Sequence, residues 1–362
     1  MQSPVGPRVI FEGREYDYFS GTGYLGLQSH PRVIEAAREA LETYGFATAA
    51  SRGGLGEHPL YDELEKQTCL YFNSEKSLSF PSGYMGISIL TQASSPQFDH
   101  IFIDSSAHFS LWDAAQNTNK PITPFAHLQP ERLHEALERE LLPRERPLVL
   151  SDGVFPISGE IAPLPEYLFI VKRYQGMVFL DDAHAVGVLG PHGQGVPDYF
   201  HIQDTTACRT SATLAKALGG YGGIIWGSAR DVDYLDQNAR ICVGSSPLPL
   251  PVAAASAAAL KIAREQPGLR LDLRENVRYA RSELNKLGWQ LPDTPVPILC
   301  LPAFASINLD RIQKGLFDQG IATTVARSYT STPPGGALRI AIFANHSRQQ
   351  IDKLVACLGK LI

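Results

Sequence analysis

The sequence has few cysteines and no long apolar run, and each shortage excludes a class of protein. Its five cysteines, an odd number in 362 residues, are scattered and form no CxxC pair, which argues against a disulfide framework and a zinc site. No apolar run reaches the roughly 18–20 residues that a membrane-spanning helix needs. The first eight residues lack the basic and then apolar pattern of a signal peptide. We therefore expect a reduced, cytoplasmic protein with no membrane span and no metal.

The chain also lacks an excess of positive charge. Its net charge of −5 gives no reason to expect nucleic acid or an anionic membrane as a partner. Because 44% of the residues are hydrophobic and 19% are charged, there is enough apolar material for a large core. The length exceeds that of one ordinary domain and suggests two or three.

Short apolar runs alternate with helical segments between about residues 76 and 245. The strand candidates are residues 77–80, 101–103, 147–150, 177–180 and 223–226. Fully apolar strands separated by helices predict an α/β fold in which a largely parallel sheet is covered on both faces. Ligands of such sheets bind at the carboxyl ends of the strands, and the polar clusters of this sequence follow those ends.

The segments around this central region are expected to be mainly helical. Helices are predicted at residues 32–44, 60–71, 252–264 and 271–287, and residues 295–362 read as strand–helix–strand–strand–helix. Pro247, Pro249 and Pro251 break the chain before the third of these helices. The predicted division is an N-terminal arm and helix (1–45), a large domain (46–245) and a small α+β domain (246–362).

Lys216 is the most informative residue, because it lies in a run of small and apolar residues, 210–223, that contains no acid to pair it. An ammonium is costly to bury, so such a lysine tends to lose its proton and become a nucleophile. A neutral amine beside glycine-rich backbone suits Schiff-base chemistry on an aldehyde cofactor. The alternative is a lysine at the edge of a glycine-rich turn whose ammonium reaches solvent.

Asp181 ends a strongly apolar strand, and His184 follows three residues later. A carboxylate at this point can keep a pyridine nitrogen protonated, so that the ring withdraws electrons from a carbanion. The alternative is a buried aspartate that accepts hydrogen bonds from loop amides. Together with Lys216, this spacing indicates a pocket for pyridoxal 5'-phosphate (PLP).

Three further strand regions carry polar residues. Residues 80–86 follow a strand and open a helix, where free backbone N–H groups can bind phosphate, although plain packing also explains such turns. His108 could stack on a planar ring or cap the following helix, and Asp152 could simply cap its loop. Arg339 lies inside an apolar strand, where its guanidinium could bind a substrate carboxylate or form an internal ion pair.

The chain resembles the α-oxoamine synthase family of fold-type-I PLP enzymes. The most specific matching segments are 181–187 (Asp-Asp-Ala-His-Ala-Val-Gly) and 213–220 (Thr-Leu-Ala-Lys-Ala-Leu-Gly-Gly), and the match runs from the Tyr-Leu-Gly-Leu of residues 24–27 to Asn345-His346. The resemblance implies a large domain with a mostly parallel seven-stranded sheet between helices and a smaller α+β C-terminal domain. It also implies a homodimer with shared active sites.

The resemblance implies a role for each candidate residue. Lys216 would hold PLP as an imine and later remove the α-proton of the substrate. Asp181 would pair with the pyridinium nitrogen, His184 would bond the phenolic oxygen, and His108 would stack on the ring. Arg339 would hold the carboxylate of the amino acid.

The phosphate of PLP would be held by the turn after the first strand of the large domain, by one hydroxyl next to Lys216 and by one residue of the neighbouring subunit. These residues are Ser82, Gly83, Tyr84 and Met85, the last two through their backbone amides, together with Thr213 and, from the neighbour, Ser246.

Three departures from the family pattern fall close to the chemistry. Thr22 stands where the family usually has the asparagine that approaches the substrate, and Ala107 stands where it usually has an asparagine before the stacking histidine. Pro156 replaces a serine and has neither a hydroxyl nor an N–H group. Each lost hydrogen bond would cost about 1–3 kcal/mol, so we expect the cofactor site to survive and the substrate choice to be less determined.

The implied reaction is a decarboxylating Claisen condensation of a small amino acid with an acyl thioester, which gives an α-oxoamine. The donor could be acyl-CoA or an acyl-carrier protein thioester. Two alternatives stay open: an aminotransferase or other PLP-dependent transferase of the same fold, and a non-enzymatic protein that keeps the PLP fold.

Overall fold

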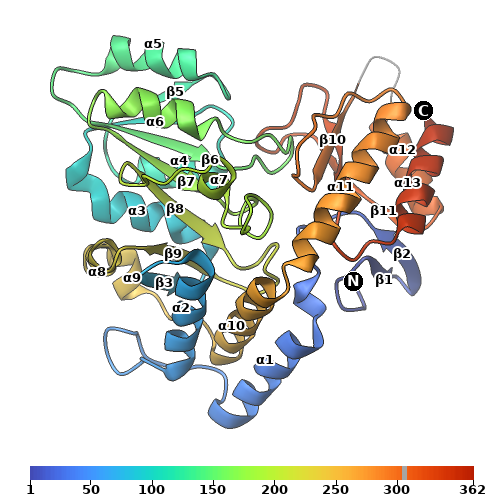
Figure 1. The fold of residues 1–362 in the computed structure, drawn as a ribbon, viewed down its shortest axis with the longest axis horizontal. Coiled ribbons are helices and arrows are strands. Elements are labelled where there is room, and N and C mark those ends of the chain that lie inside the picture. Colours follow the sequence, from blue (N-terminus) through green and yellow to red (C-terminus); the bar gives the residue numbers. More distant parts are fainter. Residues whose placement is uncertain (304–307) are drawn as a thin grey trace.

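The computed structural model describes residues 1–303 and 308–362, and a seven-stranded sheet forms the centre of its larger lobe (Figure 1). In sheet order the strands are β3 (Lys76–Phe80), β9 (Gly223–Gly227), β8 (Cys208–Thr213), β7 (Met177–Asp181), β6 (Pro147–Asp152), β4 (His100–Asp104) and β5 (Ile122–Phe125). Neighbouring strands are parallel except for β9, which runs antiparallel to both β3 and β8. The predicted α/β fold with a mostly parallel sheet is confirmed.

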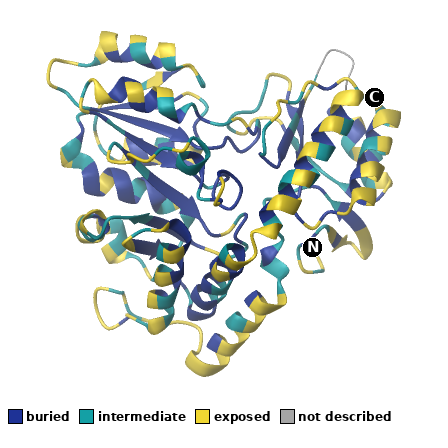
Figure 2. Ribbon diagram, viewed as in Figure 1, coloured by how far each residue is buried: buried dark blue, intermediate teal, exposed yellow. Residues whose placement is uncertain are grey.

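Both faces of this sheet are covered, and successive strand residues therefore enter different apolar clusters. Phe102 and Val149 pack in one cluster, whereas their neighbours Ile103 and Leu148 pack in the other. The first cluster includes residues of α2 (Pro59–Phe72), α5 (Pro130–Glu140), α6 (Leu164–Lys172) and α10 (Leu250–Glu265). The second includes residues of α3 (Gly86–Ser94), α4 (Phe109–Gln116) and α8 (Ala229–Asn238). This double cover explains the fully apolar strands, which appear as buried ribbons in Figure 2.

The smaller lobe contains two three-stranded sheets, β1-β2-β11 and β10-β13-β12. The strands are β1 (Arg8–Phe11), β2 (Arg14–Tyr18), β10 (Ile298–Pro302), β11 (Ile321–Ala322), β12 (Thr324–Ala326) and β13 (Ala337–Ala341). The helices are α11 (Gly268–Lys286), α12 (Leu309–Asp318) and α13 (Arg348–Leu361). Three strands follow α12, where two were predicted. The segment directly after the helix forms two short strands in different sheets: β11 pairs with β2, and β12 pairs with β13.

The N-terminal hairpin β1–β2 was not predicted, and it joins the C-terminal part of the chain. β2 pairs in parallel with β11, with Asp17 opposite Ile321. The two ends of the chain therefore both lie in the smaller lobe (Figure 1). The helix α1 (Pro31–Tyr44) then leads to the larger lobe and packs against α10, which also contacts α2. The three-part domain division stays a prediction.

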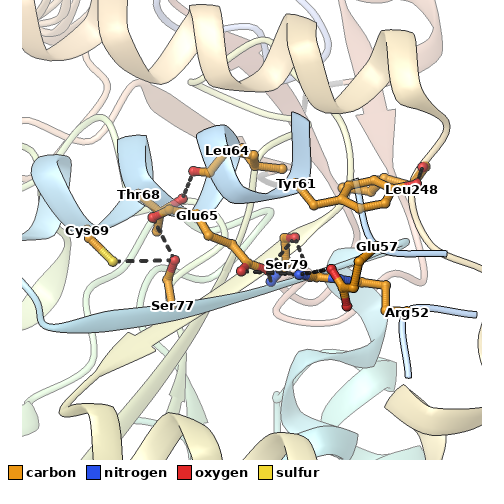
Figure 3. A network of polar contacts seen from close by, with 10 residues as sticks. All are labelled: Arg52, Glu57, Tyr61, Leu64, Glu65, Thr68, Cys69, Ser77, Ser79 and Leu248. Carbon is orange, nitrogen blue, oxygen red and sulfur yellow. Dashed lines mark hydrogen bonds and ion pairs between the residues drawn. The ribbon is translucent and has the colours of Figure 1, made fainter. Parts of the chain in front are cut away.

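A network of polar contacts ties the loop before α2 to the first strand of the large sheet (Figure 3). The Arg52 guanidinium forms ion pairs with Glu57 and Glu65 and lies over the Tyr61 ring. Glu65 also accepts hydrogen bonds from Ser79, from the backbone N–H at 3.0 Å and the hydroxyl at 2.9 Å. The side chains of Arg52 and Glu65 are only 23% and 17% exposed. Because water screens their attraction weakly, this ion pair contributes more to the stability of the fold than an exposed pair would.

We predict that Glu65→Gln destabilises the protein. The amide has a single oxygen and presents an NH₂ group to Arg52, so the ion pair is lost, at a cost of about 1–3 kcal/mol. The measurement is the midpoint of urea denaturation. Glu63→Gln is the matched control, because Glu63 lies on the same helix and contacts the exposed Lys66 and Gln67. Equal midpoints for the two variants would contradict a stabilising role for the network.

No helix in the described part of the chain is both long and apolar enough to cross a membrane.

Candidate active site

A cavity of about 930 Å³ opens at the carboxyl ends of the central strands and is closed on one side by residues 324–329 of the smaller lobe. This is where ligands of open α/β sheets bind. All the predicted site residues except two line it: Thr22, Ser82, Gly83, Tyr84, His108, Asp181, His184, Thr213, Lys216 and Arg339. Residues from six separate stretches of sequence are thereby brought to one place.

Met85 and Ser246 do not line this cavity. Met85 packs against the second apolar cluster, and its backbone N–H donates to the carbonyl of Ser82 at 2.9 Å. Ser246 is exposed on the segment between α9 (Arg240–Gly244) and α10, as a residue that serves a neighbouring subunit would be. The roles predicted for both stay predictions.

Lys216 follows β8 in a turn, and its half-buried side chain meets solvent at the cavity. Burial lowers the pKa of Lys216 to about 8, against the opposing charges of Asp181 and Asp152. A substantial fraction of the amine is therefore neutral near pH 7–8, as nucleophilic attack on an aldehyde requires.

Asp181 and Asp152 are direct neighbours on β7 and β6, and both are buried. Burial raises the pKa of Asp181, while the Lys216 ammonium opposes this shift. Burial and the charge of Asp181 raise the pKa of Asp152 well above its ordinary value. Two carboxyls so placed disfavour each other's ionisation, and a protonated pyridine ring bound beside them would favour the ionised form. Asp152 also accepts a hydrogen bond from the backbone N–H of His108 at 2.8 Å. It therefore anchors the loop that carries His108, in addition to its electrostatic interaction with Asp181.

Tyr24 links His184 to Arg339. Its hydroxyl lies 2.8 Å from Nδ1 of His184 and accepts from a terminal nitrogen of Arg339 at 3.2 Å. Burial lowers the pKa of His184 well below its ordinary value, so the ring is neutral. While the Tyr24 oxygen accepts from Arg339, the Tyr24 proton can point to Nδ1, and in this arrangement the ring proton of His184 is on Nε2.

Arg339 is held from three sides. It donates to the carbonyl of Pro156 at 2.7 Å and to the carbonyl of Gly21 at 3.0 Å, in addition to the Tyr24 hydroxyl. A guanidinium has five N–H donors, so two remain without a hydrogen-bond partner among the described residues and are available to a ligand. Pro156 has lost a side-chain donor but still positions Arg339 through its carbonyl.

We predict that Tyr24→Phe disturbs both ends of this link. Nδ1 of His184 and one N–H of Arg339 lose their partner, at about 1–3 kcal/mol in total. We expect the KM for the amino acid substrate to rise by roughly tenfold, and the pH titration of the cofactor absorbance to shift. Tyr61→Phe is the control, because it removes another buried tyrosine hydroxyl, bonded to the Leu248 carbonyl at 2.7 Å. Unchanged titration and KM in Tyr24→Phe would contradict the link.

His108 takes one of the two roles that the sequence left open, the helix cap, and its stacking on a cofactor ring stays a prediction. Its Nδ1 accepts from the backbone N–H of Ser110 at 3.2 Å, which caps α4, and its ring lines the cavity. Its Nε2 lies 2.6 Å from the Tyr329 hydroxyl, which comes from the smaller lobe. Sequence reasoning missed Tyr329 and gave Tyr24 no role, because their partners are distant along the chain.

The turn predicted to hold phosphate packs closely against the end of β8. A Cβ added to Gly83 would lie 2.6 Å from Cβ of Thr213, so only glycine permits this approach. The Tyr84 N–H donates to the Ser82 hydroxyl at 3.3 Å, and the Thr213 hydroxyl donates to the Gly222 carbonyl at 3.0 Å. These groups lie where the sequence predicts, at the start of α3, and their phosphate contacts stay a prediction.

The comparisons with known proteins identify the family of this chain. The family model for aminotransferase class I and II matches residues 19–358. The 8-amino-7-oxononanoate synthases of Methylococcus capsulatus and Thermoanaerobacter pseudethanolicus are 33% and 30% identical to this chain, cover all of it, and are themselves covered over 93% and 91% of their length. The chain belongs to the α-oxoamine synthase family within this class.

Solved structures of the same family superpose on the whole chain. The serine palmitoyltransferase of Sphingomonas wittichii has a TM-score of 0.93 at 26% identity, with 100% of this chain and 91% of that chain covered. A serine palmitoyltransferase from S. paucimobilis, solved with a bound PLP–myriocin aldimine, has a TM-score of 0.91 at the same identity and coverage. Family membership makes PLP the cofactor and the protein a PLP-dependent acyltransferase.

The residues of the cavity fit PLP. The half-buried Lys216 amine with a lowered pKa suits the aldehyde, and the buried Asp181 carboxylate suits the ring nitrogen. Gly83 lies close to Thr213, in the short turn that leads into α3. Backbone N–H groups at the start of a helix suit the phosphate. In the described residues no group of histidines, cysteines and acids is placed to hold a metal ion.

Proposed function

We propose that the protein condenses a small amino acid with an acyl thioester and releases carbon dioxide, a free thiol and an α-oxoamine. The observation that carries the proposal is the meeting, in one cavity, of the Lys216 amine, the Asp181 carboxylate and the two remaining donors of Arg339. The relatives named 8-amino-7-oxononanoate synthase and serine palmitoyltransferase support the same reaction type.

PLP, when bound, supplies an aldehyde that captures amines and a ring that withdraws electrons from the carbon next to the captured nitrogen. Lys216 holds the cofactor and later takes the proton from the α-carbon of the amino acid with its freed amine. Asp181 keeps the ring nitrogen protonated. Arg339 binds the amino acid carboxylate with its two free N–H groups and so fixes which α-bond faces Lys216.

Thr22 lines the cavity where the family usually has a longer amide, and the neighbouring Gly23 packs tightly on Gln28. A small side chain on the substrate, as in glycine, alanine or serine, is consistent with this arrangement. The donor is proposed to be acyl-CoA, with an acyl-carrier protein as the other source of a thioester.

The protein is proposed to act as a homodimer with shared active sites in the cytoplasm. Support comes from exposed apolar side chains along the end of α1 and the loop before α2, with Phe46 68% and Leu55 97% exposed. Large apolar side chains that are exposed close together on a surface are typical of a protein–protein interface. Ser246 lies on an exposed segment, available to a partner subunit.

The test is thiol release by the PLP-loaded protein across a grid of small amino acids and acyl-CoAs. We expect release only when both substrates are present, because the carbon nucleophile and the thioester come from different molecules. Conversion of the cofactor to its amine form by the amino acid alone, with no thiol release, would contradict the proposal and indicate an aminotransferase.

A further inference from the structure

A tyrosine of the smaller lobe lies against the histidine that faces the cofactor site. Tyr329 belongs to the loop between β12 and β13, and its hydroxyl is 2.6 Å from Nε2 of His108, 221 residues away in sequence. Its ring packs edge-on against Phe109, with 5.5 Å between the centroids. Tyr329 lines the same cavity as Lys216 and Arg339, so its side chain borders the space where the substrates would bind.

The protons of this contact follow from its surroundings. Nδ1 of His108 lies 3.2 Å from the Ser110 backbone nitrogen, whose N–H donates to it, and 2.8 Å from the Ser110 hydroxyl, which can donate to it as well. With these donors Nδ1 is an acceptor. Burial lowers the pKa of His108, so at pH 7 the ring is neutral and carries its one proton on Nε2. Nε2–H therefore donates to the Tyr329 oxygen, and this leaves the proton of the Tyr329 hydroxyl for another acceptor.

That proton is well suited to a developing negative charge. Burial and the charge of Asp152 raise the pKa of Tyr329, so the hydroxyl keeps its proton at neutral pH. A hydroxyl that accepts one hydrogen bond also becomes a stronger donor of the next. Pre-positioned donors of this kind stabilise the oxygen of a carbonyl under attack.

We propose that Tyr329 is a catalytic residue whose hydroxyl donates a hydrogen bond to the carbonyl oxygen of the acyl thioester. The proposal rests on the acyl transfer proposed above. The α-carbon of the amino acid, having lost its proton to Lys216, bonds to the carbonyl carbon, and the carbonyl electron pair moves onto the oxygen that Tyr329 faces. When the C=O bond re-forms, the C–S bond breaks and the thiolate leaves with the bonding electrons, taking a proton from Lys216. Tyr329 keeps its own proton throughout.

The test is Tyr329→Phe in the PLP-loaded protein, which keeps the ring against Phe109 and removes only the hydroxyl. We expect the rate of thiol release at saturating amino acid to fall by about 10²–10³-fold, as for the loss of one oxyanion donor. Cofactor content, read by absorbance, and amino acid affinity, read by spectral titration, should stay within about twofold of wild type. Tyr279→Phe is the control, because its hydroxyl bonds Asp352 between α11 and α13, away from the cavity.

Two results would overturn the role of Tyr329 alone. One is a variant that releases thiol as fast as the active wild type. The other is a parallel loss of cofactor content or amino acid affinity, which would mean that Tyr329 acts by positioning His108 and does not contact the donor. A wild-type protein that releases no thiol with any donor would instead contradict the acyl transfer itself, and the role of Tyr329 with it.

Discussion

Replacing Lys216 with alanine is expected to abolish thiol release. The amine that captures the cofactor is lost together with the base that removes the α-proton, and proton transfer by a positioned base alone contributes about 10²–10⁴-fold. The absorbance of the lysine-bound cofactor should also disappear. The fold should persist, because Lys216 lies in a turn at the cavity and not in the core.

The control for Lys216→Ala is Lys261→Ala. Lys261 is an exposed lysine of α10 that does not line the cavity. The control therefore shows the effect of removing one lysine side chain from elsewhere on the protein. The measurements are thiol release and the absorbance spectrum of the PLP-loaded proteins. Turnover by Lys216→Ala at a rate near that of wild type would remove the lysine from the mechanism.

Replacing Asp181 with asparagine is expected to lower turnover by about 10²–10³-fold, the range seen when one pre-positioned electrostatic group is removed from an active site. In the wild type the backbone N–H of Ala183 donates to Oδ1 of Asp181 at 3.0 Å. Asparagine has the same shape, and its amide oxygen can accept this hydrogen bond. What is lost is the charge that keeps the ring nitrogen protonated. The carbon next to the captured amine is then a weaker acid, and its proton is removed more slowly.

This prediction is checked by measuring cofactor content and turnover in the same preparation. The exposed Asp272 of α11 supplies the control variant, Asp272→Asn. A low rate with a full complement of PLP would support the electrostatic role. If activity falls only in proportion to lost cofactor, Asp181 serves binding and not the chemistry.

The apolar strands of the large sheet could be predicted from the sequence, and two others could not. β8 reads Cys-Arg-Thr-Ser-Ala-Thr and lacks the run of large apolar residues that revealed β7. It is nevertheless buried at the centre of the sheet, because its small hydroxyl side chains pack closely, as Ser211 does beneath Gly86. β5 contains Pro124, which argues against a central strand but is compatible with the edge position that β5 occupies.

The site residues, like the strands, divide into those that the sequence could predict and those that it could not. Residues that act through a local motif, such as Asp181, His184 and Lys216, could be found because their spacing around a strand end is itself informative. From the sequence, Asp152 was expected only to cap its loop and Tyr24 had no role. A role in the site required knowing that Asp152 lies beside Asp181 and that Tyr24 lies between His184 and Arg339.

The sequence by itself determined the fold class, the cofactor and the family, because these depend on local patterns: apolar runs, a lysine without a nearby acid, and an aspartate at the end of a strand. Only the tertiary structure decided which groups share protons and charge. The hydrogen bonds of His108 with Tyr329 and of Tyr24 with Arg339 join residues separated by 221 and 315 positions. Hydrogen bonds act over about 3 Å, so such partners are established only when the chain has folded.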